Sequence, residues 1–506
     1  MTFSSPPYSG HRRRSTITGS AYLALVLAIP LPAADLSSRL DHLIDSSSAL
    51  SHAFVGMRVV QLSDGRVLYS RYPERLFVPA SNMKLFTTAL ALSKLGLEYR
   101  LSTQIGGAVP IGSDGTLAGD LELIGGGDPS LSGREYPYRS HASPFAVYSF
   151  RAIEDLADQL AARGLKRIEG NIVGDDTRYV WEPQPGPWSS DSATEEYGAP
   201  VSALILHDNT FALTLRPGGH PGDLARITLT PPFENFAIEN RVLTMERGER
   251  KIEFYRSASG RELHVWGTIP KIDASYTREL AIGDPALYAA EVLRDTLVRH
   301  GISIRGEAVA RHRFPDERTE APSKLNVVLA EHRSPPLLDL LQVVDKVSQN
   351  LHAEMFLREA AVASGHPASR EAGLAAMDEF LASIGIAKEE FQFTDGSGLS
   401  RATLVSPAAI TKLLVHMNHS AHREEWLNLL PIGGDDGTLG SRFAGHPEAR
   451  AIHAKTGTLD HVKALSGYAD TPAHGRVAFS LLVNNFEEPG TGVTKAIDEV
   501  VLSLLQ

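Results

Sequence analysis

Three short motifs in a fixed order constrain this chain more than any other feature of its sequence. They are Ser81-Asn82-Met83-Lys84, Ser348-Gln349-Asn350 and Lys455-Thr456-Gly457. A serine hydroxyl is a weak nucleophile at neutral pH and needs a base within hydrogen-bond reach, and a lysine is such a base only when its pKa is lowered. The motifs supply a nucleophile, a candidate base and a second cation. The fold is therefore expected to bring three distant segments to one cleft.

The first motif predicts a catalytic helix. Ser81 and Lys84 lie in a run of mostly good helix formers, at a spacing that projects both side chains from one helical face. Lys84 is then the candidate base for Ser81. Pro79 ends the preceding extended segment, so Ser81 is expected in the first helical turn, where free N–H groups favour developing negative charge. Lys455 is the candidate cation that lowers the pKa of Lys84.

Each motif by itself has a simpler explanation. S-x-x-K occurs by chance in most long proteins. Ser348 and Asn350 could be helix-capping residues, and Thr456 and Thr458 could be ordinary threonines of a strand. The joint occurrence of all three motifs is what favours catalysis.

The sequence around the motifs strengthens this interpretation. Further segments of interest are residues 125–131, 174–179, 197–204, 395–401, 436–439 and 453–459. With the three motifs, they resemble the low-molecular-mass class C penicillin-binding proteins, exported D-alanyl-D-alanine carboxypeptidases and endopeptidases of peptidoglycan. The resemblance runs from about Val55 to the C-terminus. The middle motif departs from the usual S-D-N at Gln349, which is tolerable if only Ser348 and Asn350 point into the cleft.

The resemblance implies how acylation proceeds. Ser81 attacks the carbonyl of the penultimate D-alanine and Lys84 takes its proton. The backbone N–H groups of Ser81 and Thr458 hold the oxyanion. Ser348 relays a proton to the leaving amine, and water then releases the acyl-enzyme.

The resemblance also implies the groups that bind substrate near the scissile bond. Asn350 hydrogen-bonds the substrate amide. Lys455, with the hydroxyls of Thr456 and Thr458, attracts the terminal carboxylate. Gly457 lacks a side chain and so allows the substrate backbone to approach its strand closely.

Two further residues are candidates for reading the peptide stem. Asp176 is the acidic residue of the 174–179 motif and is expected near the side-chain amine of the substrate. Arg401 could pair with a side-chain carboxylate through two parallel hydrogen bonds. Both lie in loop-like sequences, so a turn-stabilising role is the alternative.

The order of the elements predicts an α+β fold, a transpeptidase/β-lactamase-like sandwich in which an antiparallel sheet packs against helices. Strand patterns at 54–70 and 451–484, with an amphipathic helix after the second, join both chain ends in one sheet. More than half of the chain separates Ser81 from Ser348, which requires a large inserted region of one or two smaller, strand-rich domains. We assign residues 35–100 and 325–506 to the catalytic domain and 101–324 to the insertion.

The first 34 residues are typical of a secretory signal peptide. Three arginines at 12–14 precede a short apolar stretch at 21–29 and a small-residue segment ending at 34. This pattern predicts export to the periplasm or cell-wall space. Later segments are too short to span a bilayer, and the absence of cysteine excludes a lipoprotein anchor, so no stable membrane anchor is expected. A net charge of −11 argues against nucleic-acid binding.

No cofactor or metal is expected. The sequence has neither a dinucleotide-binding glycine motif nor H-E-x-x-H, and no second motif completes the one histidine cluster, His416, His419 and His422. The expected partners are peptidoglycan stem peptides as substrates and β-lactams as covalent inhibitors, and the oligomeric state is left open. Two alternatives remain, a β-lactamase with the same nucleophile and a non-catalytic peptidoglycan-binding protein. The intact motifs weigh against the second, and the long insertion weighs against the first.

Overall fold

The structure is a computed structural model that describes residues 35–140, 150–232, 237–256, 262–317, 322–487 and 489–506. A second unit of the chain, Leu36–Gln506, is compact and contains all but one of the described residues. The predicted signal peptide, residues 1–34, lies outside the described residues. Within the described part of the chain, no helix is long and apolar enough to cross a membrane.

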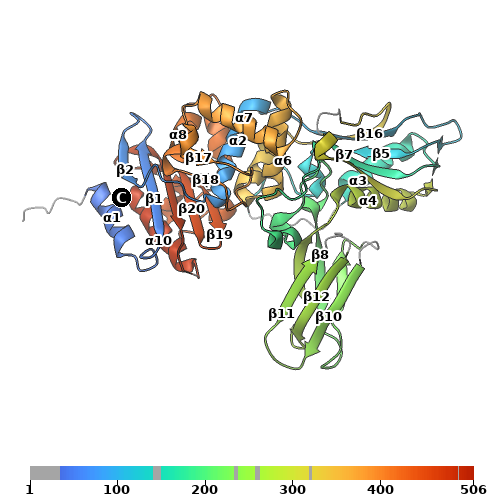
Figure 1. Cartoon of the computed structure of the whole chain (residues 1–506), viewed down its shortest axis with the longest axis horizontal. Helices are drawn as coiled ribbons and strands as arrows, with labels where there is room; N and C mark the ends of the chain where they lie inside the picture. The colour runs from blue at the N-terminus through green and yellow to red at the C-terminus, as the bar shows by residue number, and fades with distance from the viewer. Residues whose placement is uncertain (1–34, 141–149, 233–236, 257–261, 318–321, 488) are drawn as a thin grey trace, which may run out of the picture. The chain divides into compact units, whose positions relative to one another are not determined.

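The two ends of the second unit form one antiparallel sheet (Figure 1), in the order β19-β20-β21-β1-β2. Its strands are β1 (Phe54–Gln61), β2 (Val67–Arg71), β19 (Ile452–Leu459), β20 (Val462–Thr471) and β21 (Gly475–Asn484). β1 pairs with β21 along its whole length, from Phe54 opposite Asn484 to Gln61 opposite Val477. Apolar side chains of α1 (Leu36–Ser46) and α10 (Thr491–Leu502) share one core with this sheet. The predicted joining of the chain ends is confirmed.

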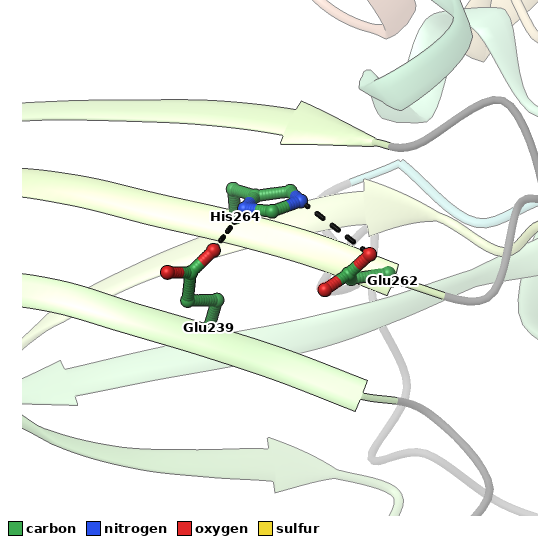
Figure 2. Close-up of side chains that lie close together, drawn as sticks. All are labelled: Glu239, Glu262 and His264. Carbon is green, nitrogen blue, oxygen red and sulfur yellow. Dashed lines mark ion pairs between the residues drawn. The ribbon is translucent and has the colours of Figure 1, made fainter.

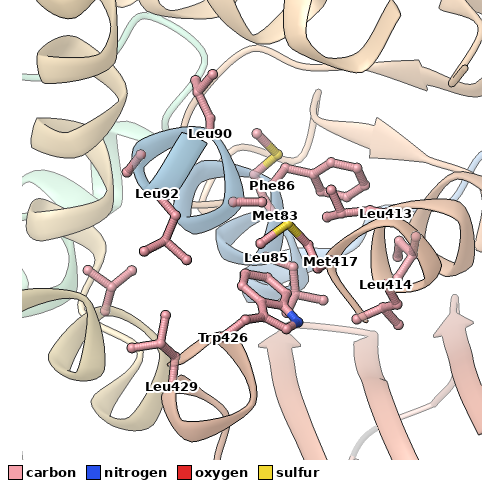
Figure 3. Close-up of a cluster of buried hydrophobic side chains, with 14 of the residues drawn as sticks. Met83, Leu85, Phe86, Leu90, Leu92, Leu413, Leu414, Met417, Trp426 and Leu429 are labelled. Carbon is pink, nitrogen blue, oxygen red and sulfur yellow. The ribbon is translucent and has the colours of Figure 1, made fainter. Parts of the chain in front are cut away.

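A buried helix lies at the centre of a second hydrophobic core, which is formed mainly by helices (Figure 3). α2 (Met83–Leu95) is buried at every position from Met83 to Leu92. A helix that is buried on all sides is enclosed by other elements. The helices around it are α5 (Leu337–Gln342), α6 (Asn350–Ala363), α7 (Arg370–Ser383), α8 (Pro407–Asn418) and α9 (Arg423–Leu429). Leu85, Leu414 and Trp426 are among the side chains that fill the space between these helices (Figure 3). The short strands β17 (Phe391–Gln392) and β18 (Leu404–Val405) pair beside them.

The inserted region is built on a second five-stranded sheet, in the order β15-β7-β5-β3-β16. Its strands are β3 (Ser102–Gly107), β5 (Leu121–Ile124), β7 (Ile172–Val180), β15 (Ala308–Arg313) and β16 (Val327–Arg333). Two amphipathic helices, α3 (Arg151–Ala162) and α4 (Pro285–Arg299), share its core. Asp284 caps α4, since its Oδ1 accepts from the N–H of Leu287 at 2.9 Å, and Pro285 occupies the first helical position.

The described residues of the inserted region also form three smaller sheets. They are β4 (Thr116–Leu117), β6 (Arg167–Ile168) and β14 (Ser303–Ile304); β8 (Thr210–Arg216), β9 (Arg226–Thr230) and β13 (Tyr276–Ala281); and β10 (Ala237–Met245), β11 (Lys251–Arg256) and β12 (Glu262–Pro270). Apolar side chains from all three belong to the core of the second five-stranded sheet. The division of the insertion into one or two domains therefore stays a prediction.

The expected α+β class is confirmed, with helices between the strands of the two chain ends. The domain boundary near residue 325 stays a prediction. β16, which follows that boundary, pairs with β3 as the edge strand of the second sheet.

Candidate active site

The three motifs meet in space although they lie on separate elements. Ser81 is in a single 3-10 turn, Ala80–Asn82, that leads directly into α2. Ser348 and Asn350 lie where a π-helical turn, Val343–Val347, ends and α6 begins. Lys455 is on the edge strand β19. Hydrogen bonds within and between the motifs, described below, join them into one site.

Lys84 has the contacts of a base for Ser81. Its Nζ lies 3.0 Å from Ser81 Oγ, 2.6 Å from Asn350 Oδ1 and 2.8 Å from the carbonyl oxygen of Ser397. The Asn350 and Ser397 atoms can only accept hydrogen bonds. A neutral amine spends its two N–H groups on them, and its lone pair then faces the hydroxyl of Ser81. The first-motif prediction is thus consistent with the geometry of the side chains.

The electrostatics favour that neutral amine. Lys84 is fully buried, and this burial, followed by the charge of Lys455, holds the pKa of Lys84 well below its usual range. Lys455 is also fully buried, which lowers its own pKa to about 8. The carboxylate of Asp345 opposes that change. Lys455 therefore keeps its charge at neutral pH more readily than Lys84.

Lys455 connects the second and third motifs. Its Nζ donates to Ser348 Oγ at 2.8 Å and to the carbonyl oxygen of Thr456 at 3.0 Å. Ser348 adopts a left-handed backbone conformation with φ 69°, which is uncommon for a residue with a side chain. This conformation ends the π-helical turn and lets the chain re-enter a helix at Asn350. The backbone conformation of Ser348 therefore helps to position the side chains of the middle motif.

The remaining residues of the third motif lie along β19. Thr456 Oγ1 donates to Thr438 Oγ1 at 2.7 Å, and Thr458 Oγ1 accepts from Lys463 Nζ at 3.3 Å. The structure shows a packing reason for glycine at position 457, and the expected role of Gly457 toward substrate stays a prediction. A Cβ at this position would lie 2.5 Å from the carbonyl oxygen of Pro79, so glycine lets β19 pack against the segment that carries Ser81.

A cleft of about 980 Å³ opens at these residues. Predicted site residues that line it are Ser81, Ser348, Asn350, Arg401, Thr456, Gly457 and Thr458. The exposed side chain of Arg401 donates through Nη1 to the carbonyl oxygen of Asp460 at 2.9 Å. Lys84 and Lys455 lie behind the cleft surface, fully buried. The cleft thus joins residues from all three motifs.

Asp176 is placed differently. It lies on β7, is 2% exposed, and is absent from the residues that line the cleft. Its Oδ1 is 2.8 Å from His312 Nδ1, and its Oδ2 accepts from Ser202 Oγ at 2.8 Å. Burial opposes the protonation of His312, but the carboxylates of Asp176 and Asp284 raise the pKa of His312 to about 10. The amine-binding role of Asp176 stays a prediction, and both of its oxygens are already bonded within the protein.

The cleft also exposes residues that the sequence motifs did not single out. Trp188 and Asp191 are such residues of the inserted region, and Tyr197, the first residue of the 197–204 segment named above, lines the cleft beside them. Asn350 Nδ2 donates to the carbonyl oxygen of Tyr197 at 2.8 Å, which fixes the orientation of the Asn350 amide. Trp188 Nε1 donates to Asp395 Oδ2 at 3.1 Å. An acidic residue after a tryptophan in a loop is a weak sequence signal, so Asp191 could be recognised only from its position.

One cluster in the described residues has the composition of a metal site (Figure 2). Glu239, Glu262 and His264 each offer a ligand atom, and these atoms lie within 4.8 Å of one another on β10 and β12. His264 directs one ring nitrogen to each carboxylate, and Arg241 also pairs with Glu239. These ion pairs account for the cluster without a metal. The three histidines at 416, 419 and 422 form no such group among the described residues.

The comparisons with known proteins show what the chain is similar to. The family model of the D-Ala-D-Ala carboxypeptidase 3 (S13) family matches residues 36–503. A D-alanyl-D-alanine carboxypeptidase of Actinomadura sp. (strain R39) is 29% identical, over 97% of this chain and 91% of its own. D-alanyl-D-alanine carboxypeptidase DacB of Haemophilus influenzae is 25% identical, over 93% of each chain. The crystal structure of penicillin binding protein 4 from H. influenzae has the same fold, with a TM-score of 0.79 at 23% identity over 93% of this chain and 99% of its own.

Proposed function

We propose, from the premise that the chain belongs to the D-Ala-D-Ala carboxypeptidase 3 (S13) family, that Ser81 is its nucleophile and Lys84 its base. The family match and the related carboxypeptidases make the chain a serine-type D-Ala-D-Ala carboxypeptidase. The observation that carries the residue roles is the environment of Lys84 Nζ. Two of its three neighbours can only accept hydrogen bonds, and the third is Ser81 Oγ.

Acylation follows from these contacts. Ser81 Oγ forms a bond to the carbonyl carbon of the penultimate D-alanine while its proton passes to Lys84 Nζ. The negative charge that develops on the carbonyl oxygen is held by the backbone N–H groups of Ser81 and Thr458. The carbon–nitrogen bond then breaks, and the leaving amine takes the proton of Ser348. Lys455, which donates to Ser348 Oγ at 2.8 Å, replaces that proton.

Deacylation reverses the proton flow. Water attacks the acyl carbon, and its proton returns to Lys455 through Ser348. Lys84 gives its proton back to Ser81 Oγ as the ester bond breaks. Asn350 binds the substrate amide, and Lys455 attracts the terminal carboxylate with the hydroxyls of Thr456 and Thr458. The enzyme is then ready for the next substrate.

The proposed substrates are stem peptides of peptidoglycan that end in D-alanyl-D-alanine. Arg401 offers a guanidinium in the cleft for a side-chain carboxylate of the stem. For a side-chain amine, Asp191 is the better placed carboxylate, because it lines the cleft whereas Asp176 is buried and bonded to His312 and Ser202. β-Lactams are proposed to acylate Ser81 as covalent inhibitors, because they present a strained amide to the same nucleophile.

The remaining proposals concern place and activity in the cell. Residues 1–34 are proposed to direct export to the periplasm or cell-wall space, as their basic and apolar segments indicate.

Terminal carboxypeptidase action and cleavage of D-alanyl cross-links use the same acyl-enzyme. A β-lactamase would also form it but would hydrolyse it rapidly. The lifetime of the penicillin adduct therefore separates the proposed peptidase from this alternative.

The test incubates the mature protein with a fluorescent penicillin and with a stem peptide ending in D-Ala-D-Ala. Intact-mass analysis is expected to show one ligand-sized increment that persists, together with release of D-alanine from the peptide. Ser81→Ala is expected to abolish both, whereas Ser51→Ala, a substitution of an exposed serine, serves as the matched control. Labelling that survives in Ser81→Ala would show that another residue is the nucleophile, and rapid turnover of penicillin would favour the β-lactamase.

A further inference from the structure

The middle residue of the second motif makes a contact that its sequence context does not explain. Gln349 Oε1 accepts from the N–H of Leu351 at 2.9 Å and so caps α6. Its Nε2 donates to Asp208 Oδ2 at 2.9 Å. Gln349 thus uses both ends of its amide, and one of them reaches the inserted region. An aspartate, the usual residue of this motif, could serve as the cap but has no donor for Asp208.

Asp208 is a buried carboxylate with a full set of donors. Its side chain is 9% exposed, and Arg134 forms an ion pair with its Oδ2. Its Oδ1 is 3.0 Å from Nε2 of the buried His352, which lies on α6. Although burial opposes ionisation, the charge of Arg134 and the hydrogen bond from His352 hold the pKa of Asp208 well below its usual range. The carboxylate therefore stays charged, and both of its oxygens require hydrogen-bond donors.

The backbone around Asp208 is strained in an unusual way. His207, Asp208 and Asn209 are consecutive residues with φ of 50°, 52° and 57°, a left-handed turn without a single glycine. The side chain of Asn209 holds this turn, because Oδ1 accepts from the N–H of Leu206 at 3.2 Å and Nδ2 donates to the carbonyl oxygen of Pro200 at 3.0 Å. Strained backbone of this kind persists only where the surroundings enforce it.

The turn faces a second left-handed residue, Ser348, across the Gln349–Asp208 hydrogen bond. Asp208, Gln349, Ser348 and Asn350 also line a common cavity of about 240 Å³. Tyr197, from the same inserted region, accepts from Asn350 through its carbonyl oxygen. The inserted region therefore holds the second motif at two of its three residues.

We propose that Asp208 is a positioning residue for acylation, which holds the Ser348-Gln349-Asn350 segment in its active conformation through Gln349. The glutamine is then the residue that this partner requires. A carboxylate at position 349 would face that of Asp208 at hydrogen-bond distance within a largely buried cluster, where two like charges repel strongly. The proposal rests on the roles of Ser348 and Asn350 given above.

The test is a double-mutant cycle on this pair. Gln349→Glu keeps the shape of the side chain and the cap of α6 but replaces the donor that faces Asp208 with an acceptor. Asp208→Asn replaces the carboxylate of the other partner with an amide. The double variant exchanges the two groups, so that position 349 carries the carboxylate and position 208 the amide that donates to it. The readouts are the second-order rate constant of acylation by a fluorescent penicillin and the thermal midpoint of each full-length mature variant.

Gln349→Glu is expected to acylate about ten- to a hundred-fold more slowly than the wild type. The double variant is expected to recover most of that loss and to exceed Gln349→Glu by about tenfold or more. Gln392→Glu makes the same change at an exposed position on β17 and is expected to leave acylation unchanged. The proposal would be overturned if the fold-losses in acylation rate of the two single variants multiply in the double variant. Full activity of Gln349→Glu would overturn it as well.

Failure to fold does not prevent a decision. If Gln349→Glu is unfolded, a folded and acylating double variant supports the pairing. A double variant that is unfolded while Asp208→Asn alone is folded contradicts it. The proposed function is judged separately, by whether the wild type is labelled on Ser81. If the wild type is not labelled, the cycle of thermal midpoints still shows whether positions 208 and 349 are coupled.

Discussion

Two buried clusters of titratable groups, each containing a residue that the sequence marks as functional, use their charges in opposite ways. Lys84 and Lys455 are two amines, and burial lowers the pKa of both. Asp176 and His312 carry complementary groups, and the two carboxylates near His312 raise its pKa. The first cluster keeps a reactive amine beside the cleft, whereas the second satisfies its charges internally. Burial beside the cleft thus lowers the pKa of a motif lysine, whereas pairing with an opposite charge uses the motif aspartate to stabilise the fold.

The largest expected effect comes from making the side chain at position 84 permanently charged, which tests whether catalysis requires a neutral amine there. Lys84→Arg retains a cation, but a guanidinium does not give up its proton at working pH. We expect penicillin acylation to fall by about a thousandfold or more, because the nucleophile loses its general base. Lys94→Arg, at an exposed position on the same helix, is the matched control. Near-normal labelling of Lys84→Arg, measured by intact mass, would place the base elsewhere.

A second test asks which of the two aspartates meets the substrate. Asp191→Asn is expected to lower kcat/KM about tenfold on stems with a free side-chain amine, since an exposed charge pair is lost from the cleft. Asp176→Asn is expected to act mainly on the thermal midpoint, because its partners are His312 and Ser202. Penicillin acylation should change little in either variant. A larger loss of kcat/KM in Asp176→Asn would restore that residue as the one that reads the stem.

The smallest expected effect is a shift in pH dependence. The pKa of Lys455 is lowered to about 8, so its charge is present below that pH and lost above it. The kcat/KM for stem peptides should therefore fall as pH rises through about 8. The buried carboxylate of Asp345 favours the charged lysine. Asp345→Asn is expected to move this alkaline limb to lower pH by about one unit.

The control for this shift is Asp155→Asn, which makes the same change at an exposed position on α3. It should leave the alkaline limb in place, as rate profiles across the pH range would show. An unchanged limb in Asp345→Asn would mean that Asp345 does not set the charge of Lys455. The cluster at His312 loses its charge in the same direction but at higher pH, and the affected quantity is stability. Its stabilising charge is complete below the ordinary histidine pKa and is lost as pH rises through about 10.

Much of the fold could be predicted because its signals are local. The first hairpin, the helix capped by Asp284 and the closing strands and helix all appear within a few residues of the expected positions. Each depends on short-range patterns of apolar residues, turns and caps. Local patterns do not indicate the pairing of the edge strand β16, because its partner β3 lies more than two hundred residues earlier in the chain.

The candidate site divides in the same way. The sequence by itself determined the chemical groups, since Ser81, Lys84 and the two other motifs are recognisable by residue type and spacing. Only the tertiary structure decided which groups retain free capacity. In the folded protein both motif lysines are buried, and Asp176 is bonded to His312. Asp191 lines the cleft, and Asp208 accepts a hydrogen bond from Gln349. The physical reason is that desolvation and hydrogen-bond partners depend on contacts between residues far apart in sequence, and these contacts set both pKa and orientation.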